Sequence, residues 1–338
     1  ASGRNQSKYD RIEEHGIHFF FGFYDNAFRL MRDTYDELAR PEEQPLSSAI
    51  GGPNPAFRPA NSTTLMEDLN GTWTRWDIKL PPKPGVPGDA TQDSPWQSFL
   101  ALLGWMGEFS DNLIAGANLQ IPPLDINRDL SRRSRRTLLS TLAEIDVGDL
   151  IRNPLSLAAR FAEALPGDAK RLWFAPYRVL KVLLTGNVEQ WLEQLGKEAK
   201  NSDVIRRGWI ILRLAHAIAL GMLRDGVIRY GYKAVDKYEF TEWLRRNGAR
   251  EREIWWSAIV TNLYSAALAF DPKTGKPDLS AGAALRALFR LFFHYKEAFL
   301  WKMQSGMGDV VFAPLYEVLS RRGVKFEFFN RVRELQLT

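Results

Sequence analysis

A long helical block between short strand-like segments is the feature that most constrains this chain of 338 residues. From Pro95 to Arg322, apolar residues recur mostly at helical spacing. Strand-like patterns occur at residues 16–22, near residue 70 and at residues 324–329. A complete doubly wound fold would instead alternate strands with helices along its whole length. We therefore expect a mostly helical α+β protein, in which a helical domain is inserted between pieces of a sheet-containing domain.

Local signals give the expected element boundaries. Apolar residues at helical spacing predict a helix from Asp25 to Leu38, which Pro41 closes. Asn70-Gly71 lies between β-branched and aromatic residues and predicts a β-hairpin near residues 63–78. The Pro- and Gly-rich segments on either side of the hairpin are expected to be loops. Further helix starts are expected at Ser94-Pro95, Asn153-Pro154, Ser202-Asp203 and Thr241.

The order of the expected elements divides the chain into three segments, the last of which begins near a carboxyl-terminal helix. A helix from Gly308 to Arg322 should end at Gly323 in the left-handed conformation, before a strand at residues 324–329. We expect residues 1–40 and residues 306–338 to belong to the sheet-containing domain. Residues 41–305, including the hairpin, are expected to form the inserted domain.

The composition excludes several classes of site and suggests a location. The chain has no cysteine, which excludes disulfides, thiolate metal sites and a cysteine nucleophile and suits a reducing compartment. Its first ten residues are polar and do not resemble a signal peptide, so we expect a cytoplasmic protein. The most apolar long stretch, from Trp209 to Ile228, contains Arg213 and Arg224 and predicts a buried helix rather than a membrane span.

A basic cluster and an apolar stripe leave two interpretations open. The net charge is +5, and the arginines are either a solvated helix face or a contact to an anionic membrane surface. No nucleic-acid-binding motif accompanies them, so nucleic acid is not an expected partner. The stripe is either domain core or a peripheral membrane contact. The cluster comprises Arg128, Arg132, Arg133, Arg135 and Arg136, and the stripe comprises Trp96, Phe99, Leu100, Leu103, Trp105 and Met106.

One stretch of the chain resembles a known enzyme family. Residues 12–31 contain an acidic pair, a Gly16-Ile17-His18 step, aromatic residues and a Gly-x-Tyr-x-Asn pattern from Gly22 to Asn26. This order resembles zeta-carotene and phytoene desaturases, which belong with the flavin amine oxidases. Three later stretches are similar to the same family in the same order. They are Thr64 to Pro87, Thr241 to Gly248 followed by Leu279-Ser280, and Lys302 to Leu335.

The resemblance implies an FAD-dependent oxidoreductase. It assigns residues 1–40 and 306–338 to an FAD-binding domain and residues 41–305 to a substrate domain. The implied reaction is the dehydrogenation or desaturation of a lipophilic substrate, such as a carotenoid or another isoprenoid. Two alternatives stay open: a flavin amine oxidase-like enzyme, and a non-catalytic subunit or relic that keeps the substrate-domain fold. The flavin would accept the hydride, so the sequence assigns no catalytic side chain and no metal ligand.

The sequence also departs from the family. Its members hold the FAD diphosphate with a strand, a Gly-x-Gly-x-x-Gly turn and a helix N-terminus, and this chain lacks that motif. We therefore expect an incomplete FAD site in this chain alone. Either the chain is a fragment, or a second polypeptide completes the site.

The resemblance names a small set of site residues. Ser2, Gly3 and Arg4 would lie beside the diphosphate, where a guanidinium suits phosphate oxygens. Gly16 and Gly22 would let the backbone approach the cofactor closely, and His18 would contact the flavin region. Val332 would offer backbone groups to the adenine. Tyr24 and Asn26 are expected in the vicinity of substrate or cofactor. Each residue also has an ordinary structural interpretation. Residues 2–4 would be a disordered chain end, the two glycines turn residues, and His18 a buried histidine. Val332 would be a strand valine, and Tyr24 and Asn26 a core residue and a helix cap.

Overall fold

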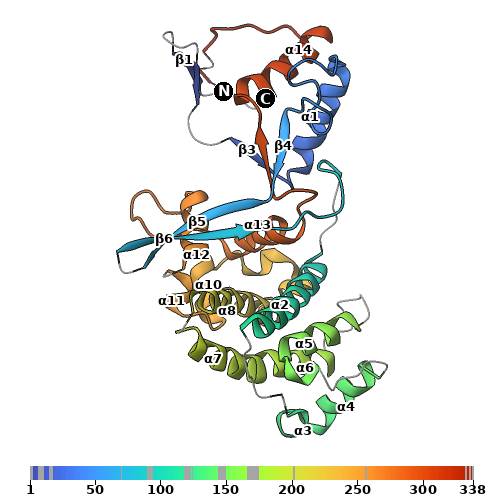
Figure 1. Cartoon of the computed structure of the whole chain (residues 1–338), viewed down its shortest axis with the longest axis vertical. Coiled ribbons are helices and arrows are strands. Elements are labelled where there is room, and N and C mark those ends of the chain that lie inside the picture. The colour runs from blue at the N-terminus through green and yellow to red at the C-terminus, as the bar shows by residue number, and fades with distance from the viewer. Residues whose placement is uncertain are drawn as a thin grey trace. The chain divides into compact units, whose positions relative to one another are not determined.

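The computed structural model describes most of the chain, in several ranges. They are residues 3–6, 11–14, 18–69, 71–89, 94–117, 123, 125–143, 150–165, 175–200, 202–255, 257–331, 333, 334 and 336. For residues 3–6, 11–14, 129 and 187, only the backbone is described. The structure is a mostly helical α+β protein with small sheets, as the sequence predicts. The chain divides into two compact units (Figure 1). Unit 1 contains residues 1–63, 79–91 and 294–338, and unit 2 contains residues 64–78 and 92–293.

Unit 1 is built around a three-stranded antiparallel sheet. Its order is β3 (Phe19–Phe21), β7 (Leu300–Met303) and β4 (Phe57–Ala60). Phe19 lies opposite Lys302 in the first pair, and Phe57 lies opposite Met303 in the second. The central strand therefore comes from the carboxyl-terminal part of the chain. A separate ribbon pairs β1 (Gly3–Gln6) with β2 (Arg11–Glu14).

Helix α1 (Asp25–Leu38) provides much of the core of unit 1. The predicted helix has the observed bounds, and its apolar face is buried at Phe28, Met31, Tyr35 and Leu38. The Tyr35 hydroxyl donates to the Val310 carbonyl at 2.9 Å. This bond joins α1 to the π-helical turn η5 (Gly308–Phe312), which continues into α14 (Ala313–Arg321). Burial raises the pKa of Tyr35 to about 12, so its hydroxyl stays a donor at neutral pH.

Gly22 permits the closest backbone approach in unit 1. Its N–H group donates to the Phe299 carbonyl at 3.1 Å, and its own carbonyl accepts from the Lys296 N–H group at 3.2 Å. A Cβ atom at this position would lie 2.0 Å from the carbonyl oxygen of Ala298. Only glycine can therefore hold this turn against residues 296–299.

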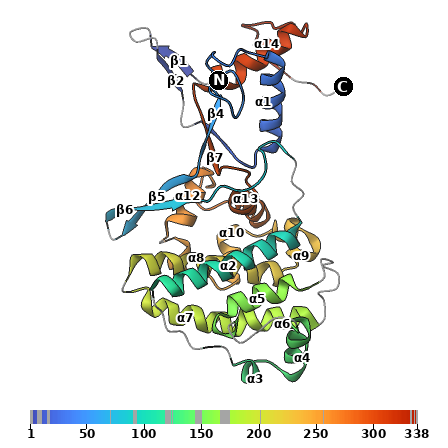
Figure 2. The same cartoon turned by 45° about the vertical axis from the view of Figure 1, so that its right-hand side comes forward.

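Unit 2 is a helical bundle that carries the β-hairpin. The hairpin strands are β5 (Ser62–Leu69) and β6 (Thr72–Lys79), with Gly71 at φ +85° in the turn, as the Asn-Gly pair predicts. Figure 2 shows α2 beside α5 and α8, with α7 next to α8. The longer helices are α2 (Pro95–Ala117), α4 (Arg132–Thr141), α5 (Pro154–Glu163), α6 (Ala175–Val182), α7 (Val188–Glu198), α8 (Asp203–Arg224), α12 (Ala258–Ala266) and α13 (Ala281–Phe293). The shorter helical segments are α3 (Ile126–Asp129), η1 (Leu150–Arg152), η3 (Leu183–Asn187), α9 (Val227–Tyr230), η4 (Tyr232–Val235), α10 (Phe240–Arg246) and α11 (Glu251–Ile254).

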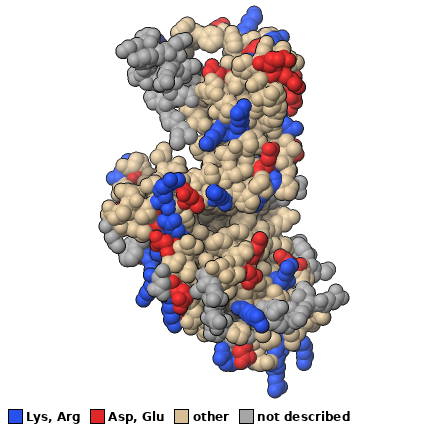
Figure 3. Space-filling view, viewed as in Figure 1, with Lys and Arg blue, Asp and Glu red and all other residues tan. Residues whose placement is uncertain are grey.

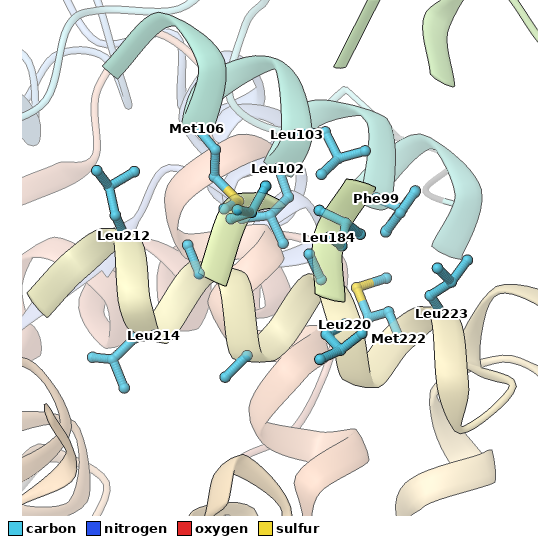
Figure 4. Close-up of a cluster of buried hydrophobic side chains, with 14 of the residues drawn as sticks. Phe99, Leu102, Leu103, Met106, Leu184, Leu212, Leu214, Leu220, Met222 and Leu223 are labelled. Carbon is cyan, nitrogen blue, oxygen red and sulfur yellow. The ribbon is translucent and has the colours of Figure 1, made fainter. Parts of the chain in front are cut away.

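The core of unit 2 contains the apolar stripe of residues 96–106. In Figure 4, Leu102 and Met106 of α2 face leucines and Met222 of α8 in one cluster of buried apolar side chains. Trp96, Phe99, Leu103 and Met106 are buried, and Leu100 and Trp105 are partly buried against the same core. The burial of these side chains supports the interpretation of the stripe as domain core. No helix among the described residues is long and apolar enough to span a bilayer.

Three predicted helix starts use the expected caps. The Ser94 hydroxyl accepts from Gln97 N–H, the Asn153 side chain accepts from Leu155 N–H, and the Ser202 hydroxyl accepts from Ile205 N–H. The fourth predicted start is displaced by one residue, because α10 begins at Phe240 with the Glu239 carboxylate as its cap.

Other local predictions differ from the structure. Residues 324–329 follow Gly323, which has φ +85° as expected, but they form an exposed irregular segment and not a strand. The segment from Arg40 to Asn61, expected to be a loop, contains β4. Since β4 pairs with β7, and β7 pairs with β3, residues 41–63 and 294–305 pack into unit 1. The sequence-based boundaries had grouped these two segments with the helical block.

Replacing Gly22 tests the backbone contact at the centre of unit 1. We expect Gly22→Ala to lower the free energy of unfolding by about 2 kcal/mol or more, because the added Cβ meets backbone that cannot rotate away. Gly116→Ala in α2 is the matched control, since a Cβ there meets nothing within 4 Å. Alanine should be neutral or stabilising at this helical position. Urea unfolding of both variants measures the difference, and equal stabilities would contradict the packing described.

Candidate functional site

The structure places only some of the sequence-predicted site residues. Ser2, Gly16 and Val332 lie outside the described residues. The backbones of Gly3 and Arg4 belong to β1, opposite Glu14 and Glu13 of β2. No side chain is described in either strand. A role of these residues at a flavin diphosphate or adenine stays a prediction.

The residues around the turn after β3 have defined surroundings. Gly22 is buried, and its close backbone approach is to the chain's own residues 296–299. His18 is partly buried just before β3. The Tyr24 ring is 39% exposed, contacts Phe20, Phe21 and Phe23, and has its pKa raised by partial burial. Asn26 lies exposed on α1, where its carbonyl accepts from the Arg29 guanidinium at 2.5 Å.

Gly22 also brings four chemically versatile side chains together. We define Asp25, Lys83, Tyr295 and Lys296 as the lysine site. Lys83 and Glu297 exchange two backbone hydrogen bonds, of 3.2 and 2.9 Å, which fix residue 83 beside the segment that packs on Gly22. The Lys83 Nζ lies 4.7 Å from the centroid of the Tyr295 ring. The site thus contains residues from three separate segments, all of them in unit 1.

The two lysines differ in their electrostatic surroundings. Lys296 is 8% exposed, and its Nζ lies 2.8 Å from the Asp25 Oδ1, so its ammonium group is compensated by a carboxylate. Burial lowers the pKa of Lys83 to about 8, because desolvation disfavours the ammonium form. The face of the Tyr295 ring favours the ammonium form, but by less than the desolvation opposes it. Lys83 is therefore partly a neutral amine at physiological pH.

Tyr295 is a buried member of the lysine site. Its side chain is 1% exposed, and its hydroxyl donates to the Pro81 carbonyl. Burial raises the pKa of this hydroxyl, which keeps it protonated and able to donate that bond. Its ring also packs edge-on against Phe299, at 6.2 Å between centroids. The neutral fraction of the Lys83 amine, held over this ring, can accept a proton or attack a carbonyl carbon.

Sequence reasoning did not find the lysine site. Lys83 stands in a proline-rich segment, and Tyr295-Lys296 follows a helix more than two hundred residues later. Neither position carries a local motif. The one sequence signal close to the site was Gly22, which the resemblance had assigned to the cofactor.

A second buried polar cluster lies in unit 2. The Nε2 atom of His216 lies 2.6 Å from the Leu184 carbonyl in the π-helical turn η3. Glu189 contacts both the Nδ1 atom of His216, at 3.7 Å, and the Arg213 guanidinium, at 2.7 Å. Arg213 is further bonded to the Gly248 carbonyl at 3.2 Å. These bonds tie α7, α8 and the end of α10 together, which is a structural role. Among the described residues, no group of acidic and histidine side chains has the arrangement of a metal site.

Comparison with protein families, with curated proteins and with solved structures finds no match to this chain. The functional assignment therefore depends on the residues themselves.

The lowered pKa of Lys83 predicts unusual reactivity. Competitive acetylation at a series of pH values, read out by peptide mass spectrometry, should give a midpoint near 8 for Lys83. The ordinary value for lysine is about 10.4. In urea the midpoint should return to the ordinary value, since unfolding removes the desolvation. A midpoint close to 10 in the folded protein would show that the amine is fully hydrated.

The burial of His216 predicts a loss of stability in acid. Desolvation lowers its pKa in the folded state, whereas unfolding restores a value of about 6.5. Stability is therefore complete above about pH 6.5 and falls as the pH drops towards the folded pKa. Between about pH 7 and pH 5 the loss attributable to this group is up to about 2 kcal/mol. Urea unfolding of His216→Gln should show a weaker pH dependence than the parent chain, and identical pH profiles would contradict this account.

Proposed function

We propose that this chain is part of an FAD-dependent oxidoreductase that dehydrogenates or desaturates a lipophilic substrate, such as a carotenoid or another isoprenoid. In this proposal unit 1 is the part of the FAD-binding domain that the chain supplies, and unit 2 forms the substrate domain. The observation that supports this proposal is how the family-like stretches are arranged in space. Stretches that resemble the desaturase family separately in sequence pack against one another in the structure.

The first and last of these stretches meet in unit 1. Phe19 of the residue 12–31 stretch pairs with Lys302, where the final stretch begins. Helix α1 then packs on α14. Arg40, just after α1, lies 2.9 Å from Glu317 of α14, and Arg322, just after α14, is paired with Glu37 of α1. Separate pieces of one family pattern should assemble in this way if they belong to one ancestral domain.

The two halves of the third stretch also meet, in unit 2. The Phe240 N–H group, next to Thr241, donates to the Leu279 carbonyl at 2.8 Å, and Glu239 forms a bridge with Ser280. The Tyr264 hydroxyl donates to the Glu239 carboxylate, which also caps α10. Thirty residues separate Gly248 from Leu279, yet the two halves of the stretch meet in one small cluster.

The described residues supply little of a dinucleotide site. The Gly22 N–H group and carbonyl are both used within the chain, so neither is free to bind a phosphate. The sequence has no Gly-x-Gly-x-x-Gly turn. We therefore infer that groups beyond the described residues, in this chain or on a partner polypeptide, complete the diphosphate contact. The protein would contribute position and a dry cavity, and the flavin would supply hydride acceptance.

Flavin retention tests the proposal in two arms. The chain of 338 residues by itself should lose added FAD on desalting, because its sequence lacks the Gly-x-Gly-x-x-Gly turn and helix N-terminus that usually neutralise the two phosphate charges. Protein expressed from the complete natural reading frame, together with any partner that copurifies, should keep a flavin absorbance band. A stable flavin band in the first arm would contradict the incomplete site, and its absence from both arms would contradict the flavoenzyme assignment.

Substrate-dependent flavin reduction tests the reaction. Under anaerobic conditions, a carotenoid precursor in detergent should bleach the flavin band of the holoprotein, because the flavin accepts the hydride. Bleaching by primary amines and not by the isoprenoid would identify an amine oxidase-like enzyme instead. A flavin that no substrate of either class reduces would favour a non-catalytic subunit.

A further inference from the structure

A basic surface lies on helices α3 and α4 of unit 2. Five arginines occur between residues 128 and 136, on helices α3 and α4. Figure 3 shows basic side chains projecting from the part of unit 2 that these helices form. Arg128, Arg132, Arg133 and Arg136 are exposed, and Arg135 is partly buried. The chain thus concentrates like charges where they repel one another.

The charges on α4 have no acidic counterpart within the described part of the chain. Arg135 donates to the Asn127 side chain at 2.8 Å, which is a neutral partner. No ion pair involves Arg132, Arg133 or Arg136 among the described residues, and the first turn of α4 carries no acidic residue. The positive end of a helix dipole favours anions, so arginines in this turn are placed against the local field. An anion bound there would relieve both the repulsion and the dipole conflict.

Three of these arginines face the same hollow. Of the described residues, Arg132, Arg135, Arg136, Leu139 and Ser140 line an open depression of about 480 Å³. Their spacing of three and four positions places them on one face of α4. Arg133 is not among the lining residues, although it is exposed on the same helix. The depression is therefore a local feature of one helix face.

We propose that this face binds a phosphate-bearing anion with an adjoining apolar part. Guanidinium groups match phosphate oxygens in charge and in planar, bidentate geometry. Leu139 lies among the arginines and is 41% exposed, so it offers apolar contact to the body of the ligand. The Ser140 hydroxyl donates to the Thr137 carbonyl at 3.1 Å, so the guanidinium groups are the phosphate donors of this face. The phosphate belongs either to a phospholipid headgroup or to a soluble organic phosphate.

Two double variants separate a defined site from diffuse attraction. Arg132→Gln with Arg136→Gln removes two charges that line the depression. Arg128→Gln with Arg133→Gln removes two charges from the same cluster outside it. Each pair changes the net charge equally and leaves the apolar faces of α3 and α4 intact. Far-ultraviolet circular dichroism and thermal unfolding without ligand confirm that both variants fold.

Binding is measured with pyrophosphate by calorimetry, and with vesicles of neutral lipid with or without phosphatidic acid by flotation. We expect the lining variant to lose roughly tenfold or more in affinity, and the outer variant to lose less than threefold. If pyrophosphate binds with this pattern, a soluble phosphate is the ligand. If only the phosphatidic acid vesicles do so, the ligand is the lipid headgroup. Equal losses in the two variants would show that general surface charge attracts the probe. No binding to either probe would show that this face is not an anion site. Either of those results overturns the proposal.

Discussion

The backbone contact between Gly22 and residues 296–299 is the constraint on which unit 1 depends. It sets β3 beside β7, so that strands from opposite parts of the chain share one sheet. The same contact places Asp25 next to Lys296, and Lys83 next to Tyr295. A side chain at position 22 would push the two backbones apart and separate these groups together. Both the sheet and the lysine site therefore require that residue 22 has no side chain.

Elements specified by near neighbours could be predicted from the sequence. Helix α1 follows from apolar periodicity, and the hairpin follows from Asn-Gly chemistry. Strand β4 was missed because Pro59 breaks the usual strand pattern. Its position at the edge of the sheet accommodates proline, since one side of an edge strand needs no donor. Residues 324–329 have strand composition, but no described segment pairs with them, and pairing partners cannot be found from local sequence.

The candidate site was less predictable than the fold. The pKa of Lys83 is lowered by groups from segments far from it in sequence, and no neighbouring residue signals that burial. The resemblance assigned Gly22 to a close approach of the cofactor, whereas the close approach among the described residues is that of the chain's own backbone. The arginine cluster was visible as composition. Which of the arginines line the depression could not be predicted, because that depends on the face of α4 on which each one lies. Arg132 and Arg136 line the depression, and Arg133 does not.

The division of unit 1 into three chain segments has a consequence for biosynthesis. Phe19 to Phe21 leave the ribosome before unit 2, but their partner strand β7 is made only after the whole of unit 2. At about 5–20 residues per second, this delay is on the order of tens of seconds. During that time three consecutive phenylalanines have no sheet to join, and such apolar strands attract other nascent chains. Because unit 2 is made of residues that precede β7, we expect it to be able to fold while the amino-terminal segment still lacks its partner strand.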